Sequence, residues 1–157
     1  MASTLKLFAA STQLEKLILS KPVQTYIPFD DAALRNLEPL RNLKEVRAHQ
    51  TRIPGAALAQ FRLSHLDLNY DRTFNDQGMA SLGPMTGLSR LYLRGTSITD
   101  AGLLHLKELT GLEELDLADT GVTDIGLQYL AGLKNLRRLN LRAAGVTDAG
   151  LDSLRGI

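Results

Sequence analysis

The chain has 157 residues, which suits a single domain, and its 18 Lys and Arg nearly balance its 17 Asp and Glu. The net charge of +1 gives no long-range field to attract nucleic acid or an anionic membrane, so neither is expected as a partner. Cysteine is absent, which excludes a disulfide framework and a cysteine-based zinc site.

One short pattern, Leu-x-x-Leu-x-Leu, recurs along the whole chain. Its copies start at Leu14, Leu43, Leu63, Leu88, Leu112 and Leu136. The successive spacings are 29, 20, 25, 24 and 24 residues, which is typical of stacked structural repeats. Within each copy, apolar residues alternate with polar ones, and this alternation predicts a short strand with one buried face.

The segment before the first copy, residues 1–13, is interpreted as half a repeat or a cap. Leu5 and Phe8 fall where the helical leucines of later repeats lie, which favours a short helix over an extra edge strand. No cleaved secretion signal is recognised here, and no apolar run approaches the roughly 18 residues of a transmembrane helix. A cytoplasmic protein is therefore predicted, with secretion without a cleaved signal as the alternative.

The first repeat is five residues longer than the regular 24, and the extra length falls in residues 20–31. Pro22 and Pro28 predict a loop there. Tyr26 and Phe29 make this loop a candidate partner-binding segment. The alternative is that both rings fold back and cover the N-terminal core, as large apolar side chains usually do.

The second and third repeats are irregular in length. The second is shorter by four residues, although its predicted helix region, residues 54–61, keeps an apolar stripe at Leu58 and Phe61. The third has one extra residue, within residues 69–74.

The last three repeats agree well beyond their leucines. Each carries a Thr-Asp pair just before an apolar run: Thr99-Asp100, Thr123-Asp124 and Thr147-Asp148. Thr and Asp are good helix N-caps, so each pair is predicted to cap a helix. In the first of these runs, Leu103, Leu106 and Leu109 form one helical stripe.

The ninth position of the unit carries a second candidate structural contact. Each repeat is expected to form one coil, made of a strand, a helix and the loops that join them. Many repeats of this kind place Asn at the ninth position, where its side chain bridges to the neighbouring coil. Thr51, Thr96 and Thr120 are predicted to do part of this with their hydroxyl groups, whereas Ala144 has no such group.

The unit LxxLxLxxTxVTDAGLxxLxxLxx resembles a class of bacterial leucine-rich-repeat proteins with a T-D-A-G-L helix start, closely over residues 88–157 and loosely over 14–87. The resemblance implies an α/β solenoid, a curved right-handed stack whose concave face of parallel strands recognises a protein and whose helices lie on the convex face. Related repeats occur in bacterial effectors and in substrate-recognising subunits of ubiquitin ligases. Target recognition within an effector or a ligase-type adaptor is therefore an alternative function.

The candidate binding residues are the outward-pointing strand positions. Tyr92, flanked by Arg90 and Arg94, is the first choice because Tyr and Arg are enriched at binding hot spots. The remaining candidates are Arg47, Asp67, Asp116, Arg138, Asn140 and Arg142. The alternative is that these charges pair with one another across the sheet and bind nothing.

No catalytic, metal or cofactor site is expected. His49 and His65 fall at opposite ends of their strands, too far apart to share a metal, and a contact of either with Asp67 is more often an ion pair than a catalytic couple. A third possibility is a structural element that associates end to end. The chain stops just after a predicted helix with no polar closing segment, so exposed Leu and Ile side chains are expected at its C-terminal end.

Overall fold

A single parallel sheet runs through the molecule. The computed structural model describes residues 13–20 and 30–157, and in this part of the chain six strands pair in sequence order. The strands are β1 (Lys16–Ser20), β2 (Glu45–His49), β3 (His65–Asp67), β4 (Arg90–Tyr92), β5 (Glu114–Asp116) and β6 (Arg138–Asn140). Their register aligns equivalent repeat positions, as where Leu66 pairs with Leu91 and Leu91 with Leu115. The predicted strand positions are confirmed.

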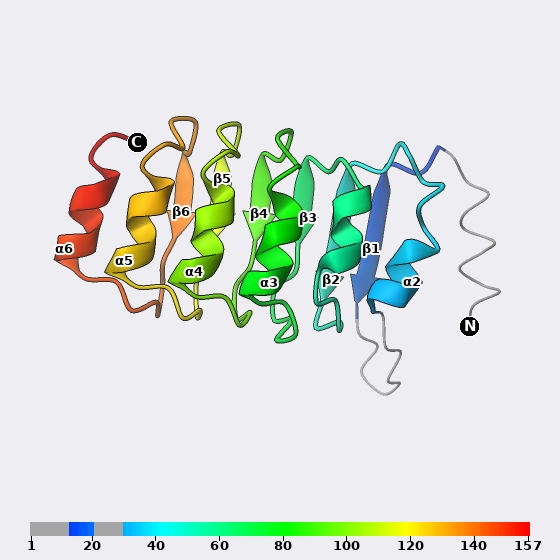
Figure 1. Cartoon of the computed structure of the whole chain (residues 1–157), viewed down its shortest axis with the longest axis horizontal. Helices are drawn as coiled ribbons and strands as arrows, with labels where there is room; N and C mark the ends of the chain where they lie inside the picture. Colours follow the sequence, from blue (N-terminus) through cyan, green and yellow to red (C-terminus); the bar gives the residue numbers. More distant parts are fainter. Residues whose placement is uncertain (1–12, 21–29) are drawn as a thin grey trace.

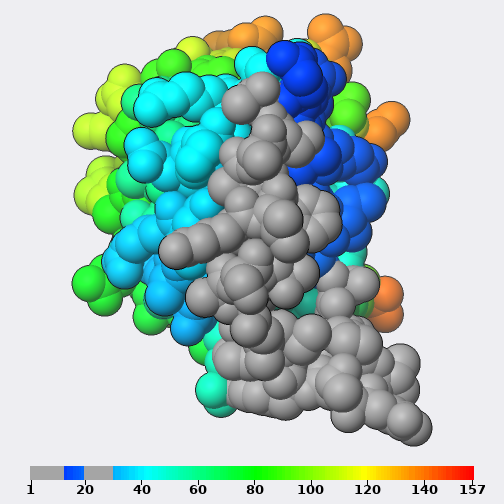
Figure 2. All heavy atoms as spheres, turned by 90° about the vertical axis from the view of Figure 1, so that its right-hand side faces the viewer, coloured from blue at the N-terminus to red at the C-terminus, as the bar shows by residue number. Residues whose placement is uncertain are grey.

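Short helices form the opposite side of each coil, in front of the sheet in Figure 1. The α-helices are α2 (Asp31–Arg35), α3 (Asp76–Met79), α4 (Asp100–Leu103), α5 (Asp124–Leu127) and α6 (Asp148–Leu151). The 3₁₀ helices are η1 (Ala56–Gln60), η2 (Ala80–Leu82), η3 (Leu104–Leu106), η4 (Gln128–Leu130) and η5 (Asp152–Leu154). In the last four coils, one α-turn runs directly into one 3₁₀ turn. From the N-terminal end, the β1 and α2 segments lie on opposite sides of the molecule (Figure 2).

The core lies between the sheet and the helices. The strand leucines Leu66 and Leu91 are completely buried, as are Leu103 and Leu106 in the helical turns and Leu109, which follows them. The predicted stripe with a spacing of three is therefore confirmed. Because one coil is too thin to enclose its own leucines, each is covered by its neighbours, and stacking makes a continuous core.

The last coil is covered on one side only. Leu151 is 47% exposed and Ile157 is 38% exposed, whereas Leu103 and Leu127, at the position of Leu151 in earlier coils, are completely buried. Leu139 and Leu141 are also only partly buried. The exposed Leu and Ile side chains expected at this end are present.

The aspartates of the helix starts link neighbouring coils, which corrects their assignment as caps. The carboxylate of Asp100 accepts hydrogen bonds from the backbone N–H and the hydroxyl of Thr123, in the next coil, at 2.7 and 2.6 Å. Asp76 binds Thr99 and Asp124 binds Thr147 in the same way. The Thr residues do stand at the N-cap positions of α4, α5 and α6, and Thr123 also accepts a hydrogen bond from Ile125 N–H, at 3.3 Å.

The ninth position also differs from the prediction. The hydroxyls of Thr96 and Thr120 donate to carbonyl groups of their own coils, at 2.7 and 2.6 Å, and do not bridge to a neighbour. Thr51 does bridge, to Asp71 at 2.7 Å. Asp71 occupies the ninth position of the third repeat, is completely buried, and binds both its own coil and the preceding one.

Two predictions lie outside the described residues. These are the half repeat or cap predicted over residues 1–13, of which only Gln13 is described, and the candidate loop with Tyr26 and Phe29. The described part after this loop begins at Asp30, which is the N-cap of α2, so the helix already starts at Asp31.

Candidate functional site

The strand face, formed by the side chains of β1 to β6 that point away from the helices, carries two rows of aligned residues. The first row reads Lys16, Glu45, His65, Arg90, Glu114 and Arg138. The second row reads Ile18, Arg47, Asp67, Tyr92, Asp116 and Asn140. In the first row, Glu45 stands beside Lys16, and Glu114 stands between Arg90 and Arg138, which favours contacts between adjacent strands.

Glu114 is the centre of one group of contacts, here called the Glu114 cluster: Tyr92, Arg90, Glu114 and Arg138. The Tyr92 hydroxyl donates to Glu114 at 2.7 Å, the Arg138 guanidinium donates at 3.0 Å, and Arg90 Nε lies 3.6 Å away. The Tyr92 hydrogen bond and the two arginines lower the pKa of Glu114. Burial and the Glu114 bond raise the pKa of Tyr92 to about 12, so its phenol remains a donor at neutral pH.

Glu45 is the centre of a second group, on β1 to β3. Its carboxylate lies 3.0 Å from Lys16 Nζ, 2.6 Å from Arg47 Nε and 3.9 Å from His65 Nδ1. Burial alone would raise the pKa of Glu45, but the hydrogen bonds from Lys16 and Arg47 outweigh it and lower that pKa. Arg47, predicted to be available to a partner, is therefore already engaged within the molecule.

The two histidines of the strand face have different environments. His65 is buried, packs edge-to-face on Tyr92 at 5.2 Å between ring centroids, and leaves its Nε2 atom without a partner in the described part of the chain. Burial lowers the pKa of His65. His49 Nε2 lies 2.7 Å from a carboxylate oxygen of Asp67, so the predicted contact is present, and it forms an ion pair when the imidazole carries a proton.

The structure places Arg94 away from Tyr92 and brings Arg90 and Arg138 to the same carboxylate. Arg94 does not flank Tyr92: its Nε donates to Asp119 at 2.8 Å, and its guanidinium carbon lies 5.5 Å from the Tyr70 ring centroid. This hydrogen bond to Asp119 raises the pKa of Arg94. Arg90 and Arg138, on strands either side of β5, meet at Glu114 instead. Asn140 donates to Asp116 at 3.1 Å, and Arg142 is exposed beyond the end of β6.

The sequence predicted Tyr92, Arg90, Arg138 and Arg47 as binding residues, but not the two glutamates that they contact. Glu45 and Glu114 occupy outward-pointing strand positions but are not among the candidate binding residues predicted from the sequence. Their signal was available, since each acid stands in the first row beside basic residues of both neighbouring strands. Tyr70 and Asp119 were missed because both lie one residue beyond the strand-face positions, in the turns.

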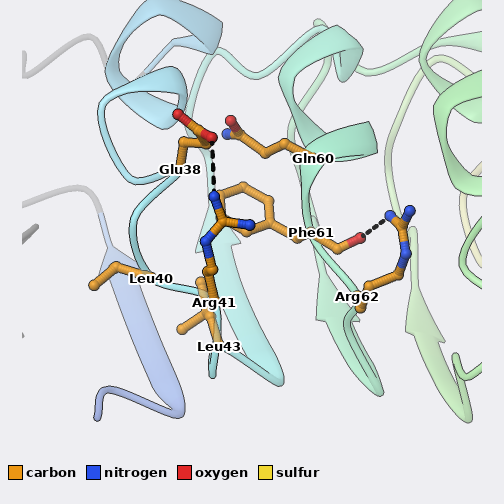
Figure 3. Close-up of a pocket in the computed structure, with 7 residues that line it drawn as sticks. All are labelled: Glu38, Leu40, Arg41, Leu43, Gln60, Phe61 and Arg62. Carbon is orange, nitrogen blue, oxygen red and sulfur yellow. Dashed lines mark hydrogen bonds and ion pairs between the residues drawn. The ribbon is translucent and has the colours of Figure 1, made fainter. Parts of the chain in front are cut away.

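A hollow of about 400 Å³ lies outside the strand face, where the second repeat is short (Figure 3). Gln60, Phe61 and Arg62 line one side, and Glu38, Leu40 and Arg41 of the preceding coil line the other together with Leu43, the first residue of the second repeat. Its apolar members are almost completely buried. Arg41 pairs with Glu38 at 3.6 Å, and Arg62 donates to the carbonyl of Phe61 at 3.0 Å, so both arginines are engaged locally.

Two features are absent from residues 13–20 and 30–157. No group of three or more His, Asp or Glu side chains is placed to hold a metal ion. None of the helices in these ranges has the length and apolar character needed to cross a membrane.

Comparisons with known proteins agree with this architecture. Residues 108–131 and 132–154 each match the family model described as Leucine Rich repeat. No curated protein sequence matches the chain.

Two similar solved structures are internalins from Listeria monocytogenes. One (inlF) has a TM-score of 0.73 and 21% identity over 97% of this chain and 48% of that one, so this chain spans about half its length. The other, internalin C2 (inlC2), has a TM-score of 0.61 and 20% identity over 99% of this chain and 70% of that one. At these identities the likeness establishes the fold, an α/β leucine-rich-repeat solenoid.

Proposed function

We propose that this chain, a leucine-rich-repeat protein of the bacterial type, is a protein-binding module whose partner docks on the strand face. The observation that carries this proposal is the Glu114 cluster. Tyr92 is held on two sides, by the Glu114 carboxylate and by the His65 ring, while Arg90 and Arg138 remain half or more exposed beside it. Tyr and Arg in a central position are the residue types that dominate binding hot spots.

Preorganisation supports the same conclusion. Ordering long side chains on association costs about 0.5–1.5 kcal/mol for each one. Here Arg138 and Tyr92 are already fixed by hydrogen bonds before any partner arrives. Helices are wider than strands, roughly 10 Å against 4.8 Å, so a stack of this kind curves with the strand face inward and presents it to a rounded partner.

The rest of the surface is assigned as follows. Asp67 and Asp116 adjoin Tyr92 directly in the second row, and Arg47 and Asn140 follow on either side. These four residues are proposed to surround Tyr92 with polar contacts, because they are already paired and mainly provide complementarity. Arg142 is proposed as a rim contact with a free charge. The loop with Tyr26 and Phe29, together with the cytoplasmic location, stays a prediction.

Two other functions are kept as alternatives. The bacterial internalins with the same fold are consistent with target recognition in an effector or adaptor, in which the same face would bind the target. The exposed Leu151 and Ile157 favour a structural role through association at the last coil. Concentration-dependent association that is lost in Leu154→Lys or Ile157→Lys would support the structural role.

The test is site-specific photo-crosslinking in cells, with the photoreactive residue at Asn140 on the strand face or at Gln128 on the helix side. A discrete adduct is expected from position 140 and not from position 128. The charge reversal Arg90→Glu/Arg138→Glu is expected to abolish that adduct.

The matched control is Lys107→Glu/Arg155→Glu, which changes the net charge by the same amount at the ends of η3 and η5. It is expected to leave the adduct intact. Equal adducts from positions 140 and 128, or an adduct that survives Arg90→Glu/Arg138→Glu, would reject the strand face as the binding surface.

A further inference from the structure

Tyr70 has an unusual backbone conformation for a large residue. It stands at the eighth position of its coil, where the turn after the strand requires a positive φ, and its φ is 63°. The other coils place Gln50, Gly95, Asp119 and Ala143 there. A bulky side chain is disfavoured in this region, and the Tyr70 side chain stays 45% exposed, so burial does not offset the strain.

The exposed ring is nevertheless held in one place. It lies against Gly95 of the next coil so closely that a Cβ atom at Gly95 would come within 2.8 Å of Tyr70 Cδ1. The Arg94 guanidinium covers the ring at 5.5 Å and donates to Asp119 at 2.8 Å. Arg94 thus fixes the positions of both Tyr70 and Asp119.

These residues border an open hollow of about 390 Å³, which lies on the side of the molecule formed by the turns after β3, β4 and β5. It is lined by Tyr70, Arg72, Gly95, Thr96, Ser97 and Asp119. The Asp119 charge is balanced by Arg94. The Arg72 side chain, by contrast, is exposed and has no ion pair with any described residue, while its own carbonyl accepts from the Ser97 hydroxyl at 2.8 Å. The hollow therefore combines an exposed, immobilised ring with one uncompensated positive charge.

We propose that this hollow is a second binding site, which takes an acidic peptide segment of a partner protein. A carboxylate of the segment pairs with Arg72, and the apolar or aromatic side chain beside it packs on Tyr70. The site lies in the turns after β3, β4 and β5, away from the strand face, so it goes beyond the proposed function and does not depend on it.

The charges favour a carboxylate over a phosphate. Arg72 supplies a single free positive charge, which a carboxylate balances, and its planar guanidinium matches a carboxylate with two parallel hydrogen bonds. A phosphate group carries nearly two negative charges, so one of them would remain unbalanced at a site with a single free arginine.

The experiment is an NMR titration of the ¹⁵N-labelled full chain with the blocked peptide Gly-Phe-Asp-Gly and with its twin that has Asn in place of Asp. Saturable shifts are expected at the amides of Arg72, Gly95 and Ser97. The Asp peptide is expected to bind about threefold more tightly than its twin, the range for an exposed charge pair. Arg72→Gln should remove that difference, and Arg155→Gln, an exposed arginine on the helix side, should keep it.

A second variant separates binding from folding. Asn tolerates a positive φ, so Tyr70→Asn should keep or raise the thermal midpoint while it weakens both peptides. Equal binding of the two peptides, an unchanged preference in Arg72→Gln, or shifts confined to other regions would overturn the proposal. Tighter binding of inorganic phosphate than of the Asp peptide would overturn the assignment to a carboxylate.

Discussion

Asp71 links two neighbouring coils through four hydrogen bonds to one buried carboxylate. One carboxylate oxygen accepts from the Thr51 hydroxyl at 2.7 Å and from Ile53 N–H at 2.9 Å, and the other accepts from Thr73 N–H and hydroxyl at 3.0 and 2.6 Å. In Asp71→Ala the buried Ile53 N–H loses its partner, which costs about 1–3 kcal/mol by itself. We expect the free energy of unfolding, measured by urea denaturation, to fall by about 3 kcal/mol.

Two further variants sharpen this prediction. Asp71→Asn keeps one accepting oxygen but turns an NH₂ group toward two donors, so an intermediate loss is expected. Thr120→Ala removes only a hydrogen bond within one coil, for which about 1 kcal/mol is expected. If Asp71→Ala cost no more than Thr120→Ala, the bridge would not be a major source of stability.

His65 should make stability sensitive to pH. Burial lowers its pKa in the folded chain, whereas the unfolded chain titrates near 6.5. Below pH 6.5 the unfolded chain binds the proton at His65 more readily than the folded chain does. The contribution of neutral His65 to the free energy of unfolding is therefore complete above pH 6.5 and is lost as the pH falls. We expect the urea midpoint to decrease between about pH 7.5 and pH 5.5.

His65→Gln, which does not titrate, serves as the control because it should flatten this dependence. The interval from about pH 7.5 to pH 5.5 lies above the ordinary pKa of 4.5 of Glu45 and Glu114. The pKa values of these two acids are lowered further in the folded chain, so they change stability only in more acidic solution. A slope that is equally steep in His65→Gln would assign the effect to other groups.

At the scale of the elements, the helix start depends on a contact between Asp and Gly in successive coils. At Gly126 an added Cβ would meet the Asp100 carboxylate and come within 2.9 Å of Leu103 Cδ1. Ala normally favours a helix over Gly by about 0.5–1 kcal/mol, but here the crowding should dominate. We expect Gly126→Ala to lower the free energy of unfolding by about 1–3 kcal/mol, measured by urea denaturation.

Gly87→Ala is the matched control, since nothing lies within 4 Å of a Cβ atom there and no positive φ is required. It should be neutral or slightly stabilising. The double variant Asp100→Ala/Gly126→Ala should cost less than the sum of its single changes, because the first removes the atoms with which the second collides. Additive losses would contradict the proposed contact.

The sequence predicted the strands and the leucine stripe but not the contacts between coils, and the difference has a physical reason. The strands and the helical leucine stripe follow from periodicity within one repeat, and the structure has both. The role of Asp100 could not be predicted in this way, because its partner Thr123 belongs to the next coil. The same limit applied to the site, where Tyr92 and Arg90 were found on the strand face while Arg94 turned toward Tyr70, a residue of the preceding coil.

At the scale of the molecule, stability is shared between neighbours. An interior coil buries its leucines on both sides, whereas β6 and α6 have a neighbour on one side only. Asp124 shows what a following coil supplies, since its hydrogen bonds from Thr147 lower its pKa. Asp148 is at the same position, and within the described residues no later Thr donates to it. The last coil is therefore expected to open first on heating.

Adding one coil tests whether stability depends on such neighbours. We expect a consensus unit, LxxLxLxxTxVTDAGLxxLxxLxx, joined to Ile157 through two residues that restore the spacing of 24 residues from Leu136, to pair with β6 and to cover Leu139 and Leu151. The Thr of its Thr-Asp pair should donate to Asp148, as Thr147 donates to Asp124. Burial of these leucines should raise the free energy of unfolding, measured by urea denaturation, by at least about 2 kcal/mol. A unit with Ala in place of that Thr should give a smaller gain, and one with Ser in place of its strand leucines should give none. Equal gains from all three units would mean that added length stabilises the chain without repeat stacking.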